Sequence, residues 1–267
     1  MTRPPSADSA PSGPSPTAID GPLAAFLKDL RLEHLLFSLP FTALAAAWVA
    51  AAAPESLSRR QWLLAAVLLL VAHLAAYVAG MAFNRLADRR IDALNPRTRC
   101  RTLPAGRLSP RFVLAVVLAG AAVFVLAALA FQPLLGNPWP AWLALPFLAV
   151  LLIYSYAKRF TVLTHWWIGL CQGLAPLGAW IALTGGLALP AHGPPSPTPC
   201  RHPLLLAAAI VFWTAGFDIL YSLQDVDVDR SARLRSIAAR FGPRAAIAVA
   251  RINHALMVLP VSYTHLR

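Results

Sequence analysis

Three polar residues spaced four apart are the first sign of chemistry in this sequence. Asn84, Asp88 and Asp92 form one stripe of oxygen atoms if their segment is helical, because residues four apart share a helix face. Two like charges at this spacing destabilise a helix unless a cation lies between them. Mg²⁺ suits the position, since it takes oxygen ligands from one or two carboxylates and completes its shell with water or phosphate. The same spacing also arises by chance, and acids beside arginines are common on a solvated rim.

A second acidic group lies further along the chain. Asp218, Asp225 and Asp229 are seven and four residues apart, with Ser222 on the same helical face and Tyr221 beside it. Asp218 follows 16 residues that carry no charged side chain. An acid near membrane depth is by default a candidate for a functional site. Two such stripes favour a shared site over a solvated rim.

Long uncharged segments surround both groups and must position them. The 267 residues are 58% hydrophobic and only 13% charged, whereas soluble domains are about 45–50% apolar and roughly 25% charged. No Asp, Glu, Lys or Arg occurs in four long runs, at 61–84, 112–157, 160–200 and 202–217. These runs predict a membrane protein. The net charge of +12 does not indicate a nucleic-acid partner, because long neutral segments separate the basic residues.

The expected fold is an all-α, multi-pass bundle of transmembrane helices. Backbone groups in lipid must be satisfied internally, and no alternating ten-residue pattern suggests a barrel. Uncharged runs and turn signals predict about seven spans, at 35–53, 62–83, 112–131, 139–157, 166–184, 203–224 and 245–261. Residues 1–27 are expected to form a disordered cytoplasmic tail, because the stretch up to Pro22 is rich in Pro and Ser and has no apolar core.

The basic residues predict which end of the bundle faces the cytoplasm. Eighteen of the 23 Lys and Arg residues fall in the N-terminal segment and in the connections around 85–111, 158–159 and 230–244, against three on the opposite face. Lys and Arg concentrate on the cytoplasmic side of a membrane. We therefore expect a bacterial-type inner (plasma) membrane protein whose N-terminus and two acidic groups lie on the cytoplasmic side.

The charges together indicate a class of substrate. Ten Arg and Lys residues flank the acids within 84–111 and 158–159. Acids, a divalent metal and basic side chains in combination suit a diphosphate leaving group, whose charge the metal neutralises as the C–O bond breaks. A diphosphate at the boundary above an apolar bundle indicates an isoprenoid diphosphate, with its tail among the helices and water kept from an allylic cation.

At these residues the chain resembles the UbiA superfamily of intramembrane prenyltransferases, in its branch similar to 4-hydroxybenzoate polyprenyltransferases. The likeness covers about residues 28–250 and rests on motifs in a fixed order. These motifs are Arg31-Leu-Glu-His34, Leu39-Pro-Phe41, Asn84 to Asp92, Asn95-Pro-Arg-Thr98, Leu103-Pro-Ala-Gly106, Tyr154-Ser-Tyr-Ala-Lys-Arg-Phe-Thr161, Gly169 to Trp180 and Asp218 to Asp225.

The resemblance implies Mg²⁺-dependent transfer of a polyprenyl group to an aromatic acceptor, with 4-hydroxybenzoate expected, in ubiquinone or menaquinone biosynthesis. It implies that metal and diphosphate are held by Asn84, Asp88, Asp92, Asp225 and Asp229.

The same resemblance assigns further substrate contacts. Arg97, Tyr154 and Lys158 would contact the diphosphate. Ser222 is a substrate-binding candidate from its place on the face of the second acidic group. Asp218 and Tyr221 are candidates for orienting the acceptor or taking its proton, while an interfacial aromatic is the plainer interpretation of Tyr221. Arg31 would meet an acceptor carboxylate or the diphosphate, or it is a basic anchor at the membrane surface.

Two other functions stay open. The first is the same chemistry on another acceptor, such as a futalosine-type menaquinone intermediate, haem, chlorophyllide or an archaeal lipid precursor. The second is an ion-coupled transporter, which predicts acids spread through the bilayer and an inverted repeat. Five of the six clustered acids lie at one boundary instead, and no such repeat is evident. The oligomeric state is not indicated.

Some positions depart from the family pattern. Thr102 stands where relatives usually have Pro, and Arg235 and Ala238 replace a common His and Pro. The family usually has about nine spans against the seven counted here. We therefore expect a truncated prenyltransferase domain over 28–261 and a non-native tail at 262–267.

Several residues have plainer interpretations. His73 is expected to be a packing histidine, and His165 is expected to be one of the interfacial aromatic residues that open a span. Gly169, Gly173 and Gly178 are expected to allow close approach of helices.

Overall fold

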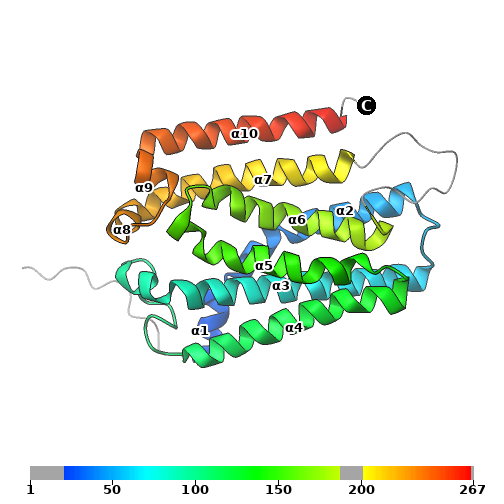
Figure 1. Ribbon diagram of the computed structural model, residues 1–267, viewed down its shortest axis with the longest axis horizontal. Helices are drawn as coiled ribbons and strands as arrows, with labels where there is room; N and C mark the ends of the chain where they lie inside the picture. Colours follow the sequence, from blue (N-terminus) through cyan, green and yellow to red (C-terminus); the bar gives the residue numbers. More distant parts are fainter. Residues whose placement is uncertain (1–20, 187–200, 266–267) are drawn as a thin grey trace, which may run out of the picture.

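The computed structural model describes residues 21–186 and 201–265, and within these ranges the regular structure is entirely helical (Figure 1). The helices are α1 (Pro22–Asp29), η1 (Leu32–Phe37), α2 (Leu39–Ala52), α3 (Arg59–Leu94), α4 (Pro110–Leu135), α5 (Trp139–Phe160), α6 (Thr164–Thr184), α7 (Arg201–Tyr221), η2 (Ser222–Asp225), α8 (Val226–Ser231), α9 (Ile237–Phe241) and α10 (Pro243–His265). The prediction of an all-α bundle is confirmed.

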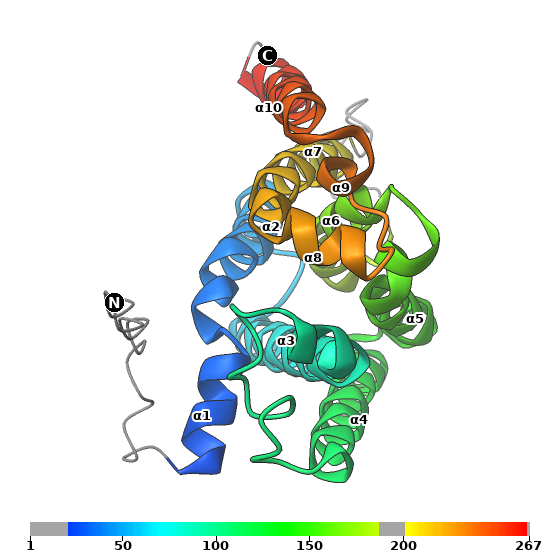
Figure 2. The same ribbon diagram turned by 90° about the vertical axis from the view of Figure 1, so that its left-hand side faces the viewer.

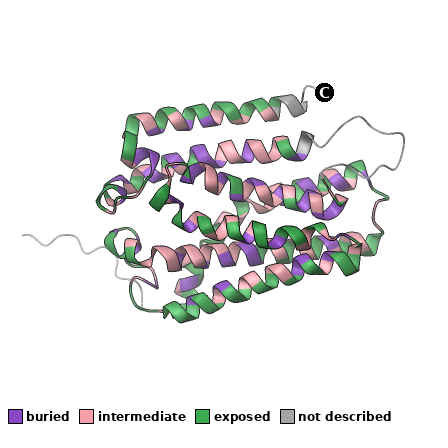
Figure 3. Cartoon of the chain, viewed as in Figure 1, coloured by how far each residue is buried: buried purple, intermediate pink, exposed green. Residues whose placement is uncertain are grey.

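The surface of the bundle is apolar, as lipid contact requires. Large hydrophobic side chains such as Leu63, Leu126 and Leu145 are about two-thirds exposed, at 67%, 64% and 67%. The interior instead contains many alanines, among them Ala65, Ala79 and Ala82, which let helices approach closely. Figure 3 shows exposed residues along the outer faces of the long helices. In a soluble protein this distribution would be inverted, so the bundle is a multi-pass membrane protein.

Six segments among the described residues are long and apolar enough to cross a membrane, where seven were predicted. The predicted seventh span lies in α10, which is not among the six. Arg251, Asn253 and His254 interrupt the apolar pattern in the middle of this helix. The helix packs along α7 at the edge of the bundle (Figure 1).

The N-terminal segment differs from the expected tail. Residues 22–27 form most of α1, which has Pro22 in its first turn. Phe26 in this helix and Leu30 directly after it are buried against α3 and α4. Arg31 then adopts a left-handed conformation with φ 54° and separates α1 from η1. The remaining expected tail, residues 1–20, lies outside the described residues. At the other end of the chain, 262–265 continue α10, and 266–267 lie outside the description.

The basic connections gather at one end of the bundle, as the sequence predicted. The loop after α3, the turn from α5 to α6, and α8 and α9 all lie at the left of Figure 1 and face the viewer in Figure 2. The connections after α2 and α4 lie at the opposite end. The two acidic groups are therefore brought to the same end by helices far apart in sequence.

Two glycines explain how α6 and α7 pack. A Cβ atom on Gly169 would lie 2.5 Å from the Val211 carbonyl oxygen, and one on Gly173 would lie 2.8 Å from that of Ala207. Only glycine fits at such distances, so the expectation of close approach is confirmed at both positions. It is wrong at Gly178, where a Cβ would meet nothing within 4 Å.

Candidate active site

The first acidic stripe extends from the bundle because α3 is unusually long. This 36-residue helix begins with a capping box between Ser58 and Gln61 and continues past the last apolar turn. Asn84 donates to Asp88 over 3.1 Å, which is the side-chain pairing that a four-residue spacing predicts. The cation expected between the acids is supplied here by arginines.

Each acid of α3 has its own arginine. Arg159 Nη2, from the end of α5, lies 3.0 Å from Asp88 Oδ1. Arg101 Nη1, from the loop after α3, lies 2.9 and 2.8 Å from the two oxygens of Asp92. Asp92 is buried, and a buried carboxylate needs such a partner.

The residues of the second stripe line one cavity, as the sequence analysis expected, but the helix that carries them is not continuous. The α-helix ends at Tyr221, a 3₁₀ turn follows through Asp225, and α8 begins at Val226. Ser222 donates its hydroxyl hydrogen to the Ile219 carbonyl oxygen over 2.7 Å and so stabilises this change. Because the 3₁₀ turn changes the helical phase, Asp218 contacts different elements from Asp225.

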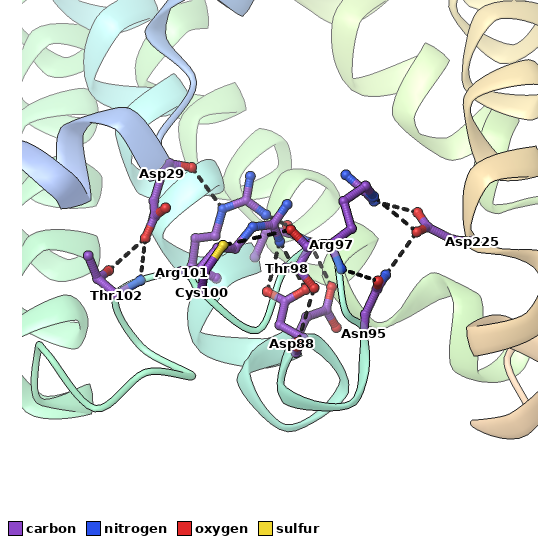
Figure 4. A network of polar contacts seen from close by, with 12 residues as sticks. Asp29, Asp88, Asn95, Arg97, Thr98, Cys100, Arg101, Thr102 and Asp225 are labelled. Atoms are coloured by element: carbon purple, nitrogen blue, oxygen red, sulfur yellow. Dashed lines mark hydrogen bonds and ion pairs between the residues drawn. The ribbon is translucent and has the colours of Figure 1, made fainter. Parts of the chain in front are cut away.

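The loop after α3 joins the two stripes (Figure 4). Asn95 Nδ2 donates to Asp225 Oδ1 over 2.8 Å. Arg97 donates two hydrogen bonds to the same carboxylate, from Nε to Oδ1 over 3.2 Å and from Nη2 to Oδ2 over 2.6 Å. Its Nη1 donates to the Tyr221 hydroxyl over 3.2 Å. Burial lowers the pKa of the Arg97 guanidinium, but hydrogen bonding to Asp225 and its charge outweigh this and leave the pKa raised. Arg97 therefore stays charged.

The same loop is anchored to α1. Thr102 donates to Asp29 Oδ2 from both its backbone nitrogen and its hydroxyl, each over 2.7 Å, and Arg85 Nε donates to the Asp29 carbonyl oxygen over 2.9 Å. Of these two bonds to Asp29, the one from the backbone nitrogen of Thr102 could not form with proline at this position, since proline has no N–H. Figure 4 shows this anchor beside the acid–arginine pairs.

Two adjoining cavities occupy the space between the helices. The smaller, of about 170 Å³, is lined by several basic side chains and by five carboxylates, four of which, those of Asp88, Asp92, Asp225 and Asp229, line this cavity alone. The larger, of about 430 Å³, extends among the membrane helices and is mostly apolar. Six residues line both cavities and define what we call the shared rim: Asn84, Arg85, Arg101, Tyr154, Asp218 and Tyr221.

The polar cavity contains most of the residues singled out from the sequence. In addition to the four carboxylates and the predicted members of the shared rim, it contains Arg97, Lys158 and Ser222. Arg31 lines only the larger cavity, and its guanidinium lies 3.4 Å from Glu33. The residues expected to hold the metal and the diphosphate therefore lie together in the polar cavity, whereas Arg31 lies outside it.

The donor set of the polar cavity fits Mg²⁺ bound together with a phosphate. No three His, Cys, Asp or Glu side chains of the described residues lie close enough to hold a metal ion on their own. Mg²⁺ usually needs only one or two carboxylates with water and substrate phosphate. Asp229 Oδ2 is buried without a hydrogen bond, with Lys158 Nζ 3.5 Å away. The buried hydroxyls of Ser155 and Thr164 beside it also lack partners in the described structure.

Sequence reasoning missed several members of the site. Asn95, Arg101 and Arg159 bind the acids, and His165 lies 2.6 Å from Asp218. The Asn95-Pro96-Arg97 segment was visible as a motif, but its partner Asp225 is 130 positions away from Asn95. His165 gave no signal beyond its position at the start of a span.

Fold and site together define a membrane-embedded helix bundle with a charged cavity above an apolar one. The model of the UbiA prenyltransferase family matches residues 39–266, and the chain belongs to this family.

Curated relatives include enzymes named for two acceptors. A 4-hydroxybenzoate octaprenyltransferase of Yersinia enterocolitica is 32% identical over 190 residues, covering 69% of this chain and 58% of the relative. A 4-hydroxybenzoate solanesyltransferase of Synechocystis is 33% identical, covering 63% and 52%. A protoheme IX farnesyltransferase of Pseudomonas fluorescens is 39% identical over 138 residues, covering 50% and 40%. The chain therefore spans between two-fifths and three-fifths of the length of these relatives.

Solved structures of the family share the fold. An apo UbiA homologue from Aeropyrum pernix is 34% identical with a TM-score of 0.72, covering 86% of this chain and 78% of the other. A homologue from Archaeoglobus fulgidus, described as bound to GPP and Mg²⁺, is 22% identical with a TM-score of 0.66, covering 91% and 78%.

Proposed function

We propose that this chain transfers a polyprenyl group from a polyprenyl diphosphate to an aromatic acceptor, with Mg²⁺ as cofactor. The observation that carries the proposal is the shared rim, where the charged cavity meets the apolar one. A prenyl diphosphate has the same division, with a charged head joined to an apolar tail at one C–O bond. The rim is where that bond would lie.

The polar cavity provides groups for the head of this substrate. Arg97, Lys158 and Arg159 would donate to the diphosphate oxygens. The carboxylates of Asp88, Asp92, Asp225 and Asp229, with Asn84, would hold Mg²⁺, which neutralises charge on the leaving diphosphate. The description of the Archaeoglobus homologue as bound to GPP and Mg²⁺ supports this assignment.

The apolar cavity provides the environment for the tail and for the reaction. Aromatic side chains of Phe37, Trp213 and Phe217 line it and lead towards Tyr221, with ring centroids about 6 Å apart along the row. Such walls exclude water as the C–O bond breaks and an allylic cation forms. The aromatic ring of the acceptor then forms the new C–C bond, and its proton leaves to restore aromaticity.

For the acceptor we propose 4-hydroxybenzoate, in ubiquinone or menaquinone biosynthesis. The names of the relatives from Yersinia and Synechocystis support this choice. The likeness to a protoheme farnesyltransferase favours haem as the second candidate. Asp218 and Tyr221 on the rim would face the acceptor.

A direct assay tests the reaction. Purified membranes containing the chain are incubated with a labelled polyprenyl diphosphate and either 4-hydroxybenzoate or haem. Labelled 4-hydroxybenzoate is expected, and chelation of Mg²⁺ with EDTA is expected to stop its formation. Labelling of haem alone would move the chain to the second acceptor, and labelling of neither acceptor in membranes that contain folded protein would contradict the proposal.

We also propose that the polar cavity faces the cytoplasm of a bacterial-type inner membrane, because the basic connections lie at that end. Cys100, exposed in the loop after α3, offers a probe, with Cys100→Ser as the control. A membrane-impermeant maleimide should label Cys100 in inside-out vesicles. Labelling in sealed right-side-out vesicles instead would contradict this orientation.

A further inference from the structure

His165 is buried at the start of α6 and joins two parts of the molecule. Its side chain has no exposed area, which corrects the expectation of an interfacial aromatic. Nδ1 lies 2.6 Å from Asp218 Oδ2 on α7, and Nε2 accepts a hydrogen bond from the Ile237 backbone nitrogen over 3.3 Å. The ring therefore bridges the rim of the cavities and the start of α9.

The two contacts together fix where the ring proton lies. A backbone N–H is always a donor, so Nε2 of His165 must act as an acceptor and carries no proton. The ring proton is therefore on Nδ1, and it is donated to the Asp218 carboxylate. His165 is thus a neutral imidazole that holds one carboxylate oxygen in place.

Both sides of the ring are held. The segment before Ile237 is tied to the end of α5, because Arg235 donates from its backbone nitrogen to the Lys158 carbonyl oxygen over 2.7 Å and from Nη1 to that of Phe160 over 2.6 Å. Rotation of the ring would break the bond to Ile237 as well as the bond to Asp218. The imidazole is therefore a fixed support for the carboxylate.

Asp218 is placed to use this support. Its side chain is 22% exposed, lines both cavities, and has no hydrogen-bond partner other than His165 among the described residues. With Oδ2 held by the ring, Oδ1 is the oxygen left for a ligand at the rim. A fixed carboxylate there accepts a hydrogen bond and repels an anion.

We propose that His165 is a positioning residue that aims Asp218 at a hydroxyl group of the acceptor. This inference rests on the proposed function and deepens it, because it specifies an acceptor that presents a hydrogen-bond donor, such as a phenol, to the rim. A carboxylate on the same acceptor would point away from Asp218. The orientation of the ring determines which carbon faces the prenyl group.

Two substitutions separate positioning from packing. His165→Phe keeps a ring of similar size and removes both hydrogen bonds, whereas His165→Gln supplies an amide that both donates and accepts. We expect the Phe variant to raise the KM for the acceptor about tenfold, as loss of one buried hydrogen bond to a charged group allows. The KM for the prenyl diphosphate should stay unchanged, and Gln should restore most of the acceptor affinity.

A matched control comes from the next residue. Trp166 donates from Nε1 to Asn253 Oδ1 over 2.9 Å and has no hydrogen bond to Asp218 in the described structure. Trp166→Phe also removes a hydrogen bond at the start of α6, so it should lower thermal stability without changing the KM for the acceptor. An equal rise in this KM in Trp166→Phe would overturn the proposal.

A double-mutant cycle tests the route through Asp218. If His165 acts through this carboxylate, His165→Phe should add little to the effect of Asp218→Asn on the KM for the acceptor. Fully additive effects, or an unchanged KM in His165→Phe, would contradict the positioning role.

The placement of the proton is tested independently of turnover. Nitrogen chemical shifts of ¹⁵N-histidine-labelled protein, assigned through His165→Gln, should show a neutral ring protonated at Nδ1. A ring protonated at Nε2 would overturn the inference even in an active enzyme. If the proton is on Nδ1 but no acceptor is prenylated, the proposed function is contradicted, while the hydrogen bond from His165 to Asp218 is confirmed.

Discussion

The two cavities are built in different ways. In the polar cavity four carboxylates are paired with Arg or Lys side chains from other segments, as in Asp88 with Arg159 and Asp225 with Arg97. In the apolar cavity the walls are mostly aliphatic, aromatic and small side chains, and His73 forms hydrogen bonds with Ser38 and Thr42. Charge and geometry define the first cavity, and shape defines the second. Substitutions in the polar cavity should therefore alter the rate of transfer or the affinity for the diphosphate, and substitutions in the apolar cavity should alter the preferred length of the prenyl chain.

The largest effect is expected when a carboxylate of the polar cavity is neutralised. Asp88→Asn or Asp225→Asn should lower kcat by about 10²–10³-fold, the loss typical when one stabilising group is removed from a developing charge. The measurement is transfer of a labelled prenyl group by purified protein. Asp227→Asn is the matched control, because Asp227 is exposed and does not line the cavity. Equal losses in all three variants would mean that the cavity has no special role.

A smaller effect is expected at Arg97. Arg97→Lys keeps the positive charge but removes the guanidinium nitrogens that donate to both Asp225 and Tyr221. We expect the KM for the prenyl diphosphate to rise about tenfold, which is the scale of a single charge-assisted hydrogen bond. The preferred length of the prenyl chain should not change. A changed length preference would show that the two cavities are not separable.

The apolar cavity should respond to volume instead. Gly178 lines it, and a Cβ there would meet nothing within 4 Å, so Gly178→Leu would fill part of the cavity. We expect the ratio of kcat/KM values for long and short prenyl diphosphates to fall about tenfold, within the range of specificity that hydrophobic pockets achieve. Gly178→Ala should leave the ratio unchanged. An unchanged ratio in the Leu variant would place the tail elsewhere.

The smallest effect concerns the anchor between α1 and the loop after α3. Thr102→Val removes the hydroxyl that donates to Asp29 and keeps the backbone donor. Loss of this bond should lower the free energy of unfolding by about 1 kcal/mol, measured by thermal unfolding in detergent. The preferred length of the prenyl chain should not change. A large loss of transfer activity would show that the anchor also shapes the polar cavity.

The two acidic stripes also differ in how well the sequence predicted them. The stripe of Asn84, Asp88 and Asp92 was predicted correctly, because one long helix keeps a regular period through it. The second stripe also lines the polar cavity, but the sequence analysis did not predict the 3₁₀ turn at Ser222–Asp225 that interrupts its helix. No single residue type marks this change, and it becomes visible only where the turn packs against its neighbours.

Contacts between distant segments were the least predictable part. The family resemblance indicated that Arg97 belongs to the site, and the structure adds that it holds Asp225. The pairing of Arg101 with Asp92 depends on how the loop folds back, and that of His165 with Asp218 depends on the approach of α6 and α7 at Gly169. Periodicity in a sequence carries information about one element, whereas these contacts arise from the arrangement of several.

The pairing of Asp88 and Asp225 with arginines has a consequence for the order of binding. If Mg²⁺ bound at Asp225 displaced Arg97, the freed guanidinium would be available to a phosphate. The same exchange holds for Asp88 and Arg159. Cation and diphosphate should therefore strengthen each other's binding by the same factor, as thermodynamic linkage requires. Either one alone should bind weakly, so the site would remain closed to free Mg²⁺ until its substrate is present.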